Sequence, residues 1–113
     1  MHRGEIWYVN LDPTIGTEIN KTRPCVIINN DLIGRLANKV IIPITEWNNR
    51  FENANWMVKI VPDQSNGLEK TSAADAFQIR SISEIRLVRK AGILTKNKLD
   101  EIVEAIANVI SEI

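Results

Sequence analysis

The chain has a single cysteine, Cys25, and a single histidine, His2. These counts exclude an internal disulfide and leave no Cys/His set large enough for a zinc site. They also exclude a mechanism with two histidines as acid and base, and a Cys–His nucleophile pair requires His2 to reach the thiol. If the protein is an enzyme, Arg, Asp, Glu, Thr or Ser must carry the chemistry. A lone cysteine is typical of a protein in the reducing cytoplasm.

Long apolar runs are also missing from the sequence. No stretch approaches the ~18 residues of a membrane span, so no membrane association is predicted. The N-terminus is charged from Arg3 on and lacks the apolar core of a secretory signal. With 113 residues, of which 44% are hydrophobic and 25% charged, the chain is long enough for one folded domain and too short for two. We therefore predict a single domain over residues 1–113.

The chain has no excess charge of either sign, because 14 Lys and Arg offset 14 Asp and Glu. The charges are nevertheless unevenly distributed. Residues 99–113 contain four acidic residues and no basic one, which leaves 14 basic against 10 acidic residues in positions 1–98. The basic part could attract a polyanion locally. A neutral protein whose last helix happens to be acidic is an equally good interpretation.

Short apolar and β-branched runs, separated by turn residues, predict six strands. They cover residues 5–11, 24–28, 39–45, 56–62, 72–79 and 86–90. Proline lacks a backbone donor, so the internal Pro43 predicts that strand 39–45 is an edge strand or contains a bulge.

The hydrophobic period changes after position 94 and predicts one amphipathic helix, capped by Thr95 or Asn97. Its apolar stripe consists of Leu99, Ile102, Val103, Ile106, Val109, Ile110 and Ile113. Short strands, long loops and one terminal helix predict a mainly β fold. We expect a small, curved antiparallel sheet or barrel over residues 1–94 and a C-terminal helix over residues 95–113.

Two loops, at residues 12–22 and 46–55, are unusually long for so short a chain, and loops of this kind often carry function. The first ends at Arg23, directly before a proline that opens a strand. An arginine held in this way suits a phosphate, because its planar fork donates two parallel hydrogen bonds to oxyanions. From spacing alone, a salt bridge from Arg23 to Glu18 or Asp12 is the simpler interpretation.

The second loop follows Thr45 and contains two aromatic residues, Trp47 and Phe51. Aromatic side chains in such a loop could stack on unpaired bases, as in proteins that bind single strands. They could equally anchor the loop, and a threonine at a strand end is usually an ordinary strand residue. Taken alone, these signals name no function.

Several motifs follow one another in a fixed order along the chain. They are Arg3–Gly4–Glu5–Ile6–Trp7, LDPTIGTE at 11–18, TRPCVI at 22–27, IPIT at 42–45, Gly67–Leu68, Ser72, QIRSI at 78–82, and Arg86–Leu87. They run in order over about three quarters of the chain and resemble the MazF/PemK (Kid) family of ribosome-independent mRNA interferase toxins. The Gly-x-Glu at 16–18 followed by Arg23–Pro24 is the most specific part.

The resemblance implies a small SH3-like barrel of the CcdB/PemK type with a terminal helix, acting as a homodimer. It implies an endoribonuclease that cleaves single-stranded mRNA at short sequences, without a metal or other cofactor, through attack by the RNA's own 2′-hydroxyl. The products would carry a 2′,3′-cyclic phosphate, or a 3′-phosphate, and a 5′-hydroxyl. A cognate MazE-like antitoxin would hold the activity off, and contact with DNA would be indirect, through the antitoxin.

The resemblance also assigns roles to individual residues. Arg23 and Thr45 would be the catalytic pair, Glu18 would support catalysis or hold Arg23, and Thr17, Trp47 and Gln78 would line the RNA groove. Arginine is a poor general base, because its pKa stays above ~12. We therefore expect Arg23 to stabilise charge on the phosphate, with Glu18 as the better candidate for the proton acceptor.

Two positions depart from the family pattern. Phe77 stands where an acidic residue usually precedes the glutamine, and Ser83 stands where an aspartate often follows. If the stretch is extended, Asp75 lies on the same face as Phe77 and would supply the missing charge. Both departures concern the second wall of the groove and leave Arg23 and Thr45 unaffected.

Two other functions remain as alternatives. CcdB-like toxins share the fold and poison DNA gyrase through the end of the last helix, where they rely on an aromatic residue. Residues 109–113 of this chain contain none. A catalytically silent RNA-binding barrel is the second alternative, which the departure at Phe77 keeps open. Cleavage of a naked oligonucleotide separates both from the ribonuclease interpretation.

Overall fold

The computed structural model describes residues 1–13, 15–18, 21–33 and 37–112, in which seven strands and one α-helix are found. The elements are β1 (Glu5–Asn10), β2 (Thr22–Ile27), β3 (Asn38–Glu46), β4 (Met57–Ile60), β5 (Ser72–Asp75), β6 (Arg80–Ser83), β7 (Leu87–Ile93) and α1 (Lys96–Ile110). Short 3-10 helices lie at η1 (Asp31–Ile33), η2 (Asn49–Phe51), η3 (Ala76–Gln78) and η4 (Glu84–Arg86). The predicted fold class, mainly β with a C-terminal helix, is confirmed.

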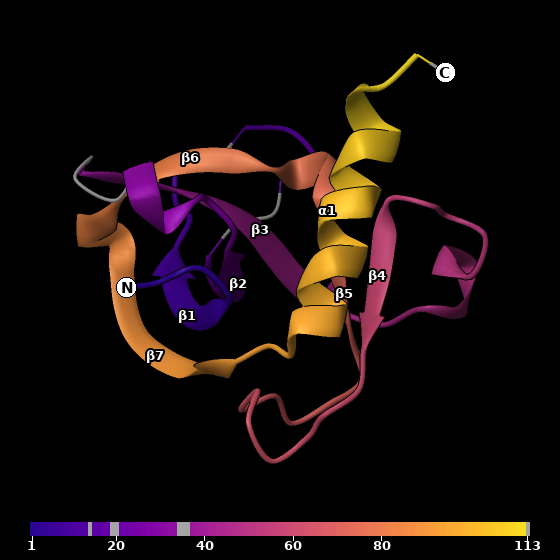
Figure 1. Cartoon of the computed structure of the whole chain (residues 1–113), viewed down its shortest axis with the longest axis horizontal. Helices are drawn as coiled ribbons and strands as arrows, with labels where there is room; N and C mark the ends of the chain where they lie inside the picture. Colours follow the sequence, from indigo (N-terminus) through magenta and orange to yellow (C-terminus); the bar gives the residue numbers. More distant parts are fainter. Residues whose placement is uncertain (14, 19–20, 34–36, 113) are drawn as a thin grey trace.

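The strands form one antiparallel sheet in the order β4-β5-β3-β2-β1-β7, and β6 pairs with β3 outside this path. Strand β7 bends around β1 at one side of the molecule, while α1 stands on the other side beside β4 (Figure 1). Within the described residues no ladder joins β4 to β7, so the curved sheet stays open. The chain therefore wraps a core without closing a barrel. No helix among these residues is long and apolar enough to cross a membrane.

Of the two alternatives for strand 39–45, an edge strand or a bulge, the edge strand is wrong, because β3 lies inside the sheet. It pairs with β2 on one side and with both β6 and β5 on the other. On that second side, Ile41 pairs with Arg80 and the next pair is Ile44 with Ala74, so two residues of β3 are skipped. Pro43 falls in this gap, which accommodates a residue without a backbone donor.

The first half of the predicted strand 72–79 is β5, and η3 replaces most of its second half. The Asp75 carboxylate accepts a hydrogen bond from Phe77 N–H at 3.0 Å and caps this short helix. The expectation that Asp75 and Phe77 share one face of an extended strand is therefore wrong. Asp75 is buried, whereas the Phe77 side chain is 66% exposed. Side-chain capping by aspartate competes with strand formation at such a position.

Helix α1 begins after Thr95, whose Oγ1 accepts a hydrogen bond from Lys98 N–H at 3.3 Å, so Thr95 and not Asn97 is the cap. The helix buries Leu99, Ile102 and Ala105. The predicted stripe is correct at its centre but too broad at its sides, since two of its members are exposed. These are Val103 and Ile110, and Ile113 lies outside the described residues.

Two hydrophobic clusters make up the core. The larger joins α1 to the sheet and includes Ile6, Ile42 and Ile102, all fully buried. The smaller lies inside the bend formed by β1, β2, β3 and β6 and includes Cys25, Ile27 and Ile82. The strands that carry the candidate site residues are thus fixed by buried neighbours on both faces. That rigidity positions the side chains at their ends.

The loop between β4 and β5 is held against β7 by hydrogen bonds and close backbone contacts. Asn66 is 1% exposed, and its Nδ2 donates to Val61 O at 3.0 Å while its Oδ1 accepts from Leu68 N–H at 3.0 Å. Ile93 N–H donates to Ser65 O at 2.9 Å. Gly67 and Gly92 let the two backbones approach, because a Cβ on Gly92 would lie 2.2 Å from Ser65 O.

Glu5 is a buried carboxylate at the start of β1 with several partners. Its oxygens accept from Trp7 Nε1 at 2.9 Å and pair with Lys90 Nζ at 3.4 Å and with the N-terminal amine at 3.5 Å. Burial alone raises the pKa of Glu5. The hydrogen bonds from Trp7 and the backbone, with the two positive charges, outweigh burial and lower this pKa from 4.5 to about 2.

We expect Glu5→Gln to reduce stability at pH 7 and to flatten its pH dependence. Because the pKa of Glu5 is lowered in the folded state, its contribution is fully present above pH 4.5 and is lost as the pH falls toward 2. A pKa lowered from 4.5 to about 2 corresponds to a contribution of roughly 3 kcal/mol. Urea unfolding of both proteins at pH 7, 4 and 3 measures it, with exposed Glu104→Gln as the control. A stability difference between wild type and Glu5→Gln that is the same at all three pH values would contradict this role.

Candidate active site

Arg23 lies inside β2, because this strand begins at Thr22, two residues before the predicted start at Pro24. Its backbone pairs with Val9 of β1, and the residue is half-buried. The neighbouring Cys25 is fully buried, with its thiol donating to Arg23 O at 3.6 Å. Burial raises the pKa of Cys25 to about 12. The thiol therefore stays protonated, and Cys25 acts as a packing residue beside Arg23 and not as a nucleophile.

Thr45 lies near the end of the central strand β3, opposite Ala73 of β5. The residue is half-buried, between the buried Ile44 and the exposed Glu46. Antiparallel pairing on a strand with a buried core fixes the Thr45 backbone, and the small alanine opposite leaves space beside it. The hydroxyl is thus a positioned donor at the rim of the sheet.

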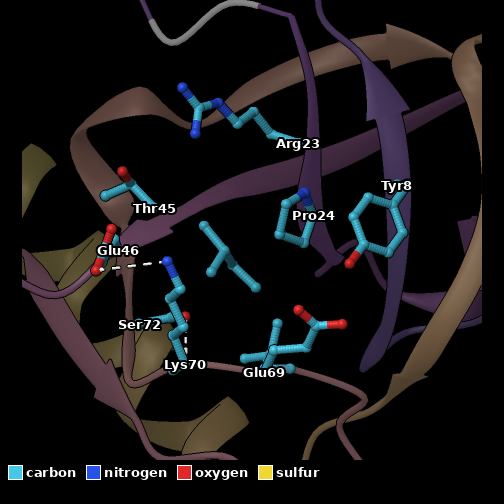
Figure 2. A pocket seen from close by; sticks show the side chains of 10 residues that line it. Tyr8, Arg23, Pro24, Thr45, Glu46, Glu69, Lys70 and Ser72 are labelled. Carbon is cyan, nitrogen blue, oxygen red and sulfur yellow. Dashed lines mark hydrogen bonds and ion pairs between the residues drawn. The ribbon is translucent and has the colours of Figure 1, made fainter.

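Arg23 and Thr45 line one pocket of about 230 Å³. The other lining residues are Tyr8, Pro24, Ile44, Glu46, Leu68, Glu69, Lys70 and Ser72. Figure 2 shows Arg23 and Thr45 toward one end of this pocket, with Tyr8 and Glu69 toward the other. Four strands and the β4–β5 loop contribute to it, so residues far apart in the sequence converge here.

The charges of this pocket are mixed. Arg23 and Lys70 are its cations, and Glu46 and Glu69 are its carboxylates. Lys70 Nζ lies 4.0 Å from a Glu46 carboxylate oxygen, and both side chains are exposed. Ser72 Oγ donates to Lys70 O at 2.8 Å and holds the loop end in place. An anion is therefore favoured beside Arg23, whereas the opposite end presents hydrogen-bond acceptors.

Thr17 and Glu18 lie in the loop between β1 and β2, and both are exposed. The Glu18 carboxylate accepts from Ile15 N–H at 2.8 Å, so it closes a turn within its own loop. The Asp12 carboxylate, the other expected partner of Arg23, accepts from Lys21 N–H at 3.0 Å. Among the described residues, the pocket wall around Arg23 includes neither Thr17 nor Glu18.

The three other residues expected in the RNA groove also lie outside the pocket wall of the described residues. Trp47 packs edge-on against Phe51, with ring centroids 5.7 Å apart, and Lys59 Nζ lies 5.0 Å from the Trp47 ring centre. Gln78 is half-buried in η3. Asp75 caps η3, and burial raises the pKa of its carboxyl although backbone hydrogen bonds from Phe77 and Gln78 oppose this.

Sequence reasoning gave no role to five other residues that line the pocket, which are Tyr8, Glu46, Glu69, Lys70 and Ser72. For Tyr8 a signal exists, because it stands inside a predicted strand, and Glu46 directly follows Thr45 at the end of another. For Glu69 and Lys70 no local signal exists. Their position depends on the contact between the β4–β5 loop and β7, and a contact so distant in sequence leaves no periodic pattern.

Metal-binding groups do not gather around this pocket. In the part of the chain that the structure describes, no group of three or more His, Cys, Asp or Glu side chains is placed to hold a metal ion.

Comparison with solved structures first defines the class of protein. The fold matches the toxin MazF-mt6 of Mycobacterium tuberculosis with a TM-score of 0.74 and 25% identity, covering 93% of this chain and 94% of that one. It also matches an endoribonuclease from a mycobacterial species, solved in complex with its cognate antitoxin. That match has a TM-score of 0.79 and 19% identity, and covers 100% and 97% of the two chains. The fold is that of MazF toxins.

The sequence then gives the family. The chain belongs to the PemK-like, MazF-like toxins of type II toxin–antitoxin systems, which it matches over residues 2–110. It is 34% identical to the endoribonuclease MazF9 of Mycobacterium tuberculosis, covering 94% of this chain and 92% of that protein. The resemblance inferred from the motifs is confirmed.

Proposed function

We propose that this toxin is a sequence-specific, metal-independent endoribonuclease that cleaves single-stranded mRNA. The observation that carries the proposal is the convergence of Arg23 and Thr45 in one pocket. Curated relatives named endoribonucleases support the activity. The Cys25 thiol is buried and its pKa is raised, so it does not serve as a nucleophile. RNA supplies a nucleophile of its own, the 2′-hydroxyl.

The reaction is an in-line transfer within the RNA. The 2′-oxygen forms a bond to the adjacent phosphorus as its proton leaves to a base. The bond from phosphorus to the 5′-oxygen of the next nucleotide then breaks, and that oxygen takes up a proton. The products are a 2′,3′-cyclic phosphate, which water can open to a 3′-phosphate, and a 5′-hydroxyl. No external oxidant, reductant or metal enters this balance.

Arg23 and Thr45 stabilise the charge that develops on the two non-bridging phosphate oxygens. The guanidinium donates two parallel hydrogen bonds and remains charged, and the Thr45 hydroxyl donates a third. Donors held in place by strands need little reorganisation when the charge forms, which is the main requirement for lowering the barrier.

Glu18 is the proposed proton acceptor, because it is the carboxylate of the Gly-x-Glu motif, five residues before Arg23 in the sequence. Its present hydrogen bond to Ile15 N–H must be exchanged for one to the 2′-hydroxyl when RNA binds. Thr17, Trp47 and Gln78 are proposed to line the RNA groove beyond the pocket. Asp75 contributes by holding η3, and through it Gln78, in position.

A cognate MazE-like antitoxin is the proposed protein partner, supported by the structural relative solved with its own antitoxin.

We propose a homodimer, because a groove for several nucleotides needs more surface than one small sheet provides. Contact with DNA is proposed only through the antitoxin, and the site of action is the cytoplasm, where the single cysteine stays reduced. Sedimentation that shows only monomer at micromolar concentration would contradict the dimer.

The test is cleavage of a fluorescent single-stranded RNA pool by the purified protein in EDTA, beside an all-deoxy pool of the same sequences. We expect cleavage of the RNA alone, unaffected by EDTA, with cyclic phosphate and 5′-hydroxyl ends. Only RNA has a 2′-hydroxyl, so cut deoxy strands would contradict the mechanism. No cleavage of a pool that samples all short sequences would favour a gyrase poison or a silent RNA-binding protein.

A further inference from the structure

We propose that the end of the pocket opposite Arg23 and Thr45 reads one nucleobase next to the scissile phosphate, and that this base is guanine. Tyr8 would supply the stacking surface and the Glu69 carboxylate the hydrogen-bond acceptors. The inference rests on the proposed function, since it concerns the RNA bound by the same pocket.

Tyr8 stands in a row of three side chains on one face of the sheet. Its register partners are Pro24 on β2 and Arg89 on β7, and partners directly opposite one another share a face. Arg89 Cζ lies 4.0 Å from the Tyr8 ring centre. Tyr8 and Pro24 both line the pocket, and Pro24 directly follows Arg23 in β2. A base that stacks on Tyr8 would therefore belong to a nucleotide whose phosphate is close to Arg23.

Glu69 is held at the pocket rim by a buried neighbour. Leu68 is 9% exposed, and its N–H donates to Asn66 Oδ1 at 3.0 Å, inside the loop that is pinned on β7. The Glu69 side chain itself is exposed, and the Tyr8 hydroxyl points toward it (Figure 2). Its backbone is thus fixed while its carboxylate faces the pocket.

The two carboxylates of the pocket differ in their partners. Glu46 pairs with Lys70 at 4.0 Å. Among the residues that the structure describes, no Lys or Arg forms an ion pair with Glu69. A carboxylate repels phosphate, so a function in RNA binding requires a group that donates hydrogen bonds. In a single strand these groups lie on the base edges and on the 2′-hydroxyl.

Guanine fits a carboxylate better than the other bases. Its Watson–Crick edge presents N1–H and N2–H side by side, which matches the two oxygens of Glu69 as a bidentate pair. Adenine and cytosine present one donor beside one acceptor, and the acceptor would face a carboxylate oxygen. Uracil presents one donor between two carbonyls. The chemistry of Glu69 therefore selects guanine.

Glu69→Gln provides a test with a defined direction. A glutamine amide presents one acceptor and one donor, which matches adenine or cytosine and no longer guanine. We expect the preference for guanine over adenine and cytosine at one position near the cut to fall about 10-fold, the size of a good bidentate contact. Sequencing the ends of products from a randomised RNA pool measures this for wild type and variant.

Two further variants complete the test. Glu104→Gln on the exposed face of α1 removes the same charge and should leave all base preferences unchanged. Tyr8→Ala should weaken RNA binding about 10-fold, whereas Tyr8→Phe, which keeps the ring, should not. Base preferences at every position that are identical in wild type and Glu69→Gln would overturn the proposal.

A binding measurement separates this proposal from the cleavage mechanism. Randomised RNA retained by Arg23→Ala and by the double variant Arg23→Ala/Glu69→Gln is sequenced without any need for cleavage. We expect guanine enrichment at one position in the first pool and its loss in the second. If the wild type cleaves nothing but this difference appears, the proposed function fails and the guanine site stands. If the wild type cleaves and the two pools agree, the guanine site alone fails.

Discussion

Arg23→Ala is expected to reduce RNA cleavage by about 10²–10³-fold or more, while the protein stays folded. The estimate is the usual effect of removing one preorganised donor to a charged transition state. Arg23 supplies two such hydrogen bonds and a positive charge, so its loss should be at the upper end. The side chain is half-buried at the edge of the pocket, not inside either hydrophobic cluster. Its removal therefore leaves the core intact.

Single-turnover cleavage of one defined RNA, with the variant at saturating concentration, measures the chemical step apart from binding. Arg23→Lys keeps the charge without the planar fork and should recover only part of the rate. Arg50→Ala, at an exposed position in η2 outside this pocket, is the matched control and should cleave like the wild type. Thermal unfolding confirms that each variant is folded. A folded Arg23→Ala with near wild-type cleavage would show that the active site lies elsewhere.

The fold class and the elements followed from local patterns. Short apolar and β-branched runs located six of the seven strands, and the change of period after position 94 located α1. Strand β6 was not predicted. The wrong prediction for strand 39–45 arose because a preference of proline was applied without knowledge of long-range strand pairing. Pro43 is tolerated in an internal strand because β3 changes its partner there, from β6 to β5. That exchange depends on η3, which the sequence pattern did not reveal.

The sequence predicted one part of the candidate site, Arg23 and Thr45, but not the part formed by Glu69 and Lys70. Arg23 and Thr45 stand at the junctions of long loops with buried strands, where the sequence itself suggests function. Glu69 and Lys70 reach the same pocket only because Asn66 and Gly67 fix a loop against β7, a contact between distant segments. Side chains that a loop positions through such a contact cannot be found by spacing alone, since their neighbours in space are not their neighbours in sequence.

Gly92→Ala is expected to destabilise the protein by about 3 kcal/mol, as an overpacked site does. A Cβ at this position would lie 2.2 Å from Ser65 O and 2.5 Å from Asn66 C, and both are backbone atoms of the pinned loop. Neither can move aside like a flexible side chain. The loop must therefore lift from β7, which breaks the hydrogen bond from Ile93 N–H to Ser65 O.

Urea unfolding at pH 7 measures this loss, and Gly16→Ala is the matched control. Gly16 has a positive φ of 63°, and apart from its two chain neighbours no described residue has an atom within 4 Å of the position a Cβ would take. Its replacement should cost only the backbone strain of about 1 kcal/mol. The two effects thus distinguish steric overlap from conformational preference.

Gly92→Ala should also weaken RNA binding in the absence of urea, because the lifted loop carries Glu69 and Lys70 of the pocket. A Gly92→Ala protein as stable as Gly16→Ala would mean that the loop moves at little cost in free energy. It would also mean that contact with β7 does not fix the positions of Glu69 and Lys70 in the pocket.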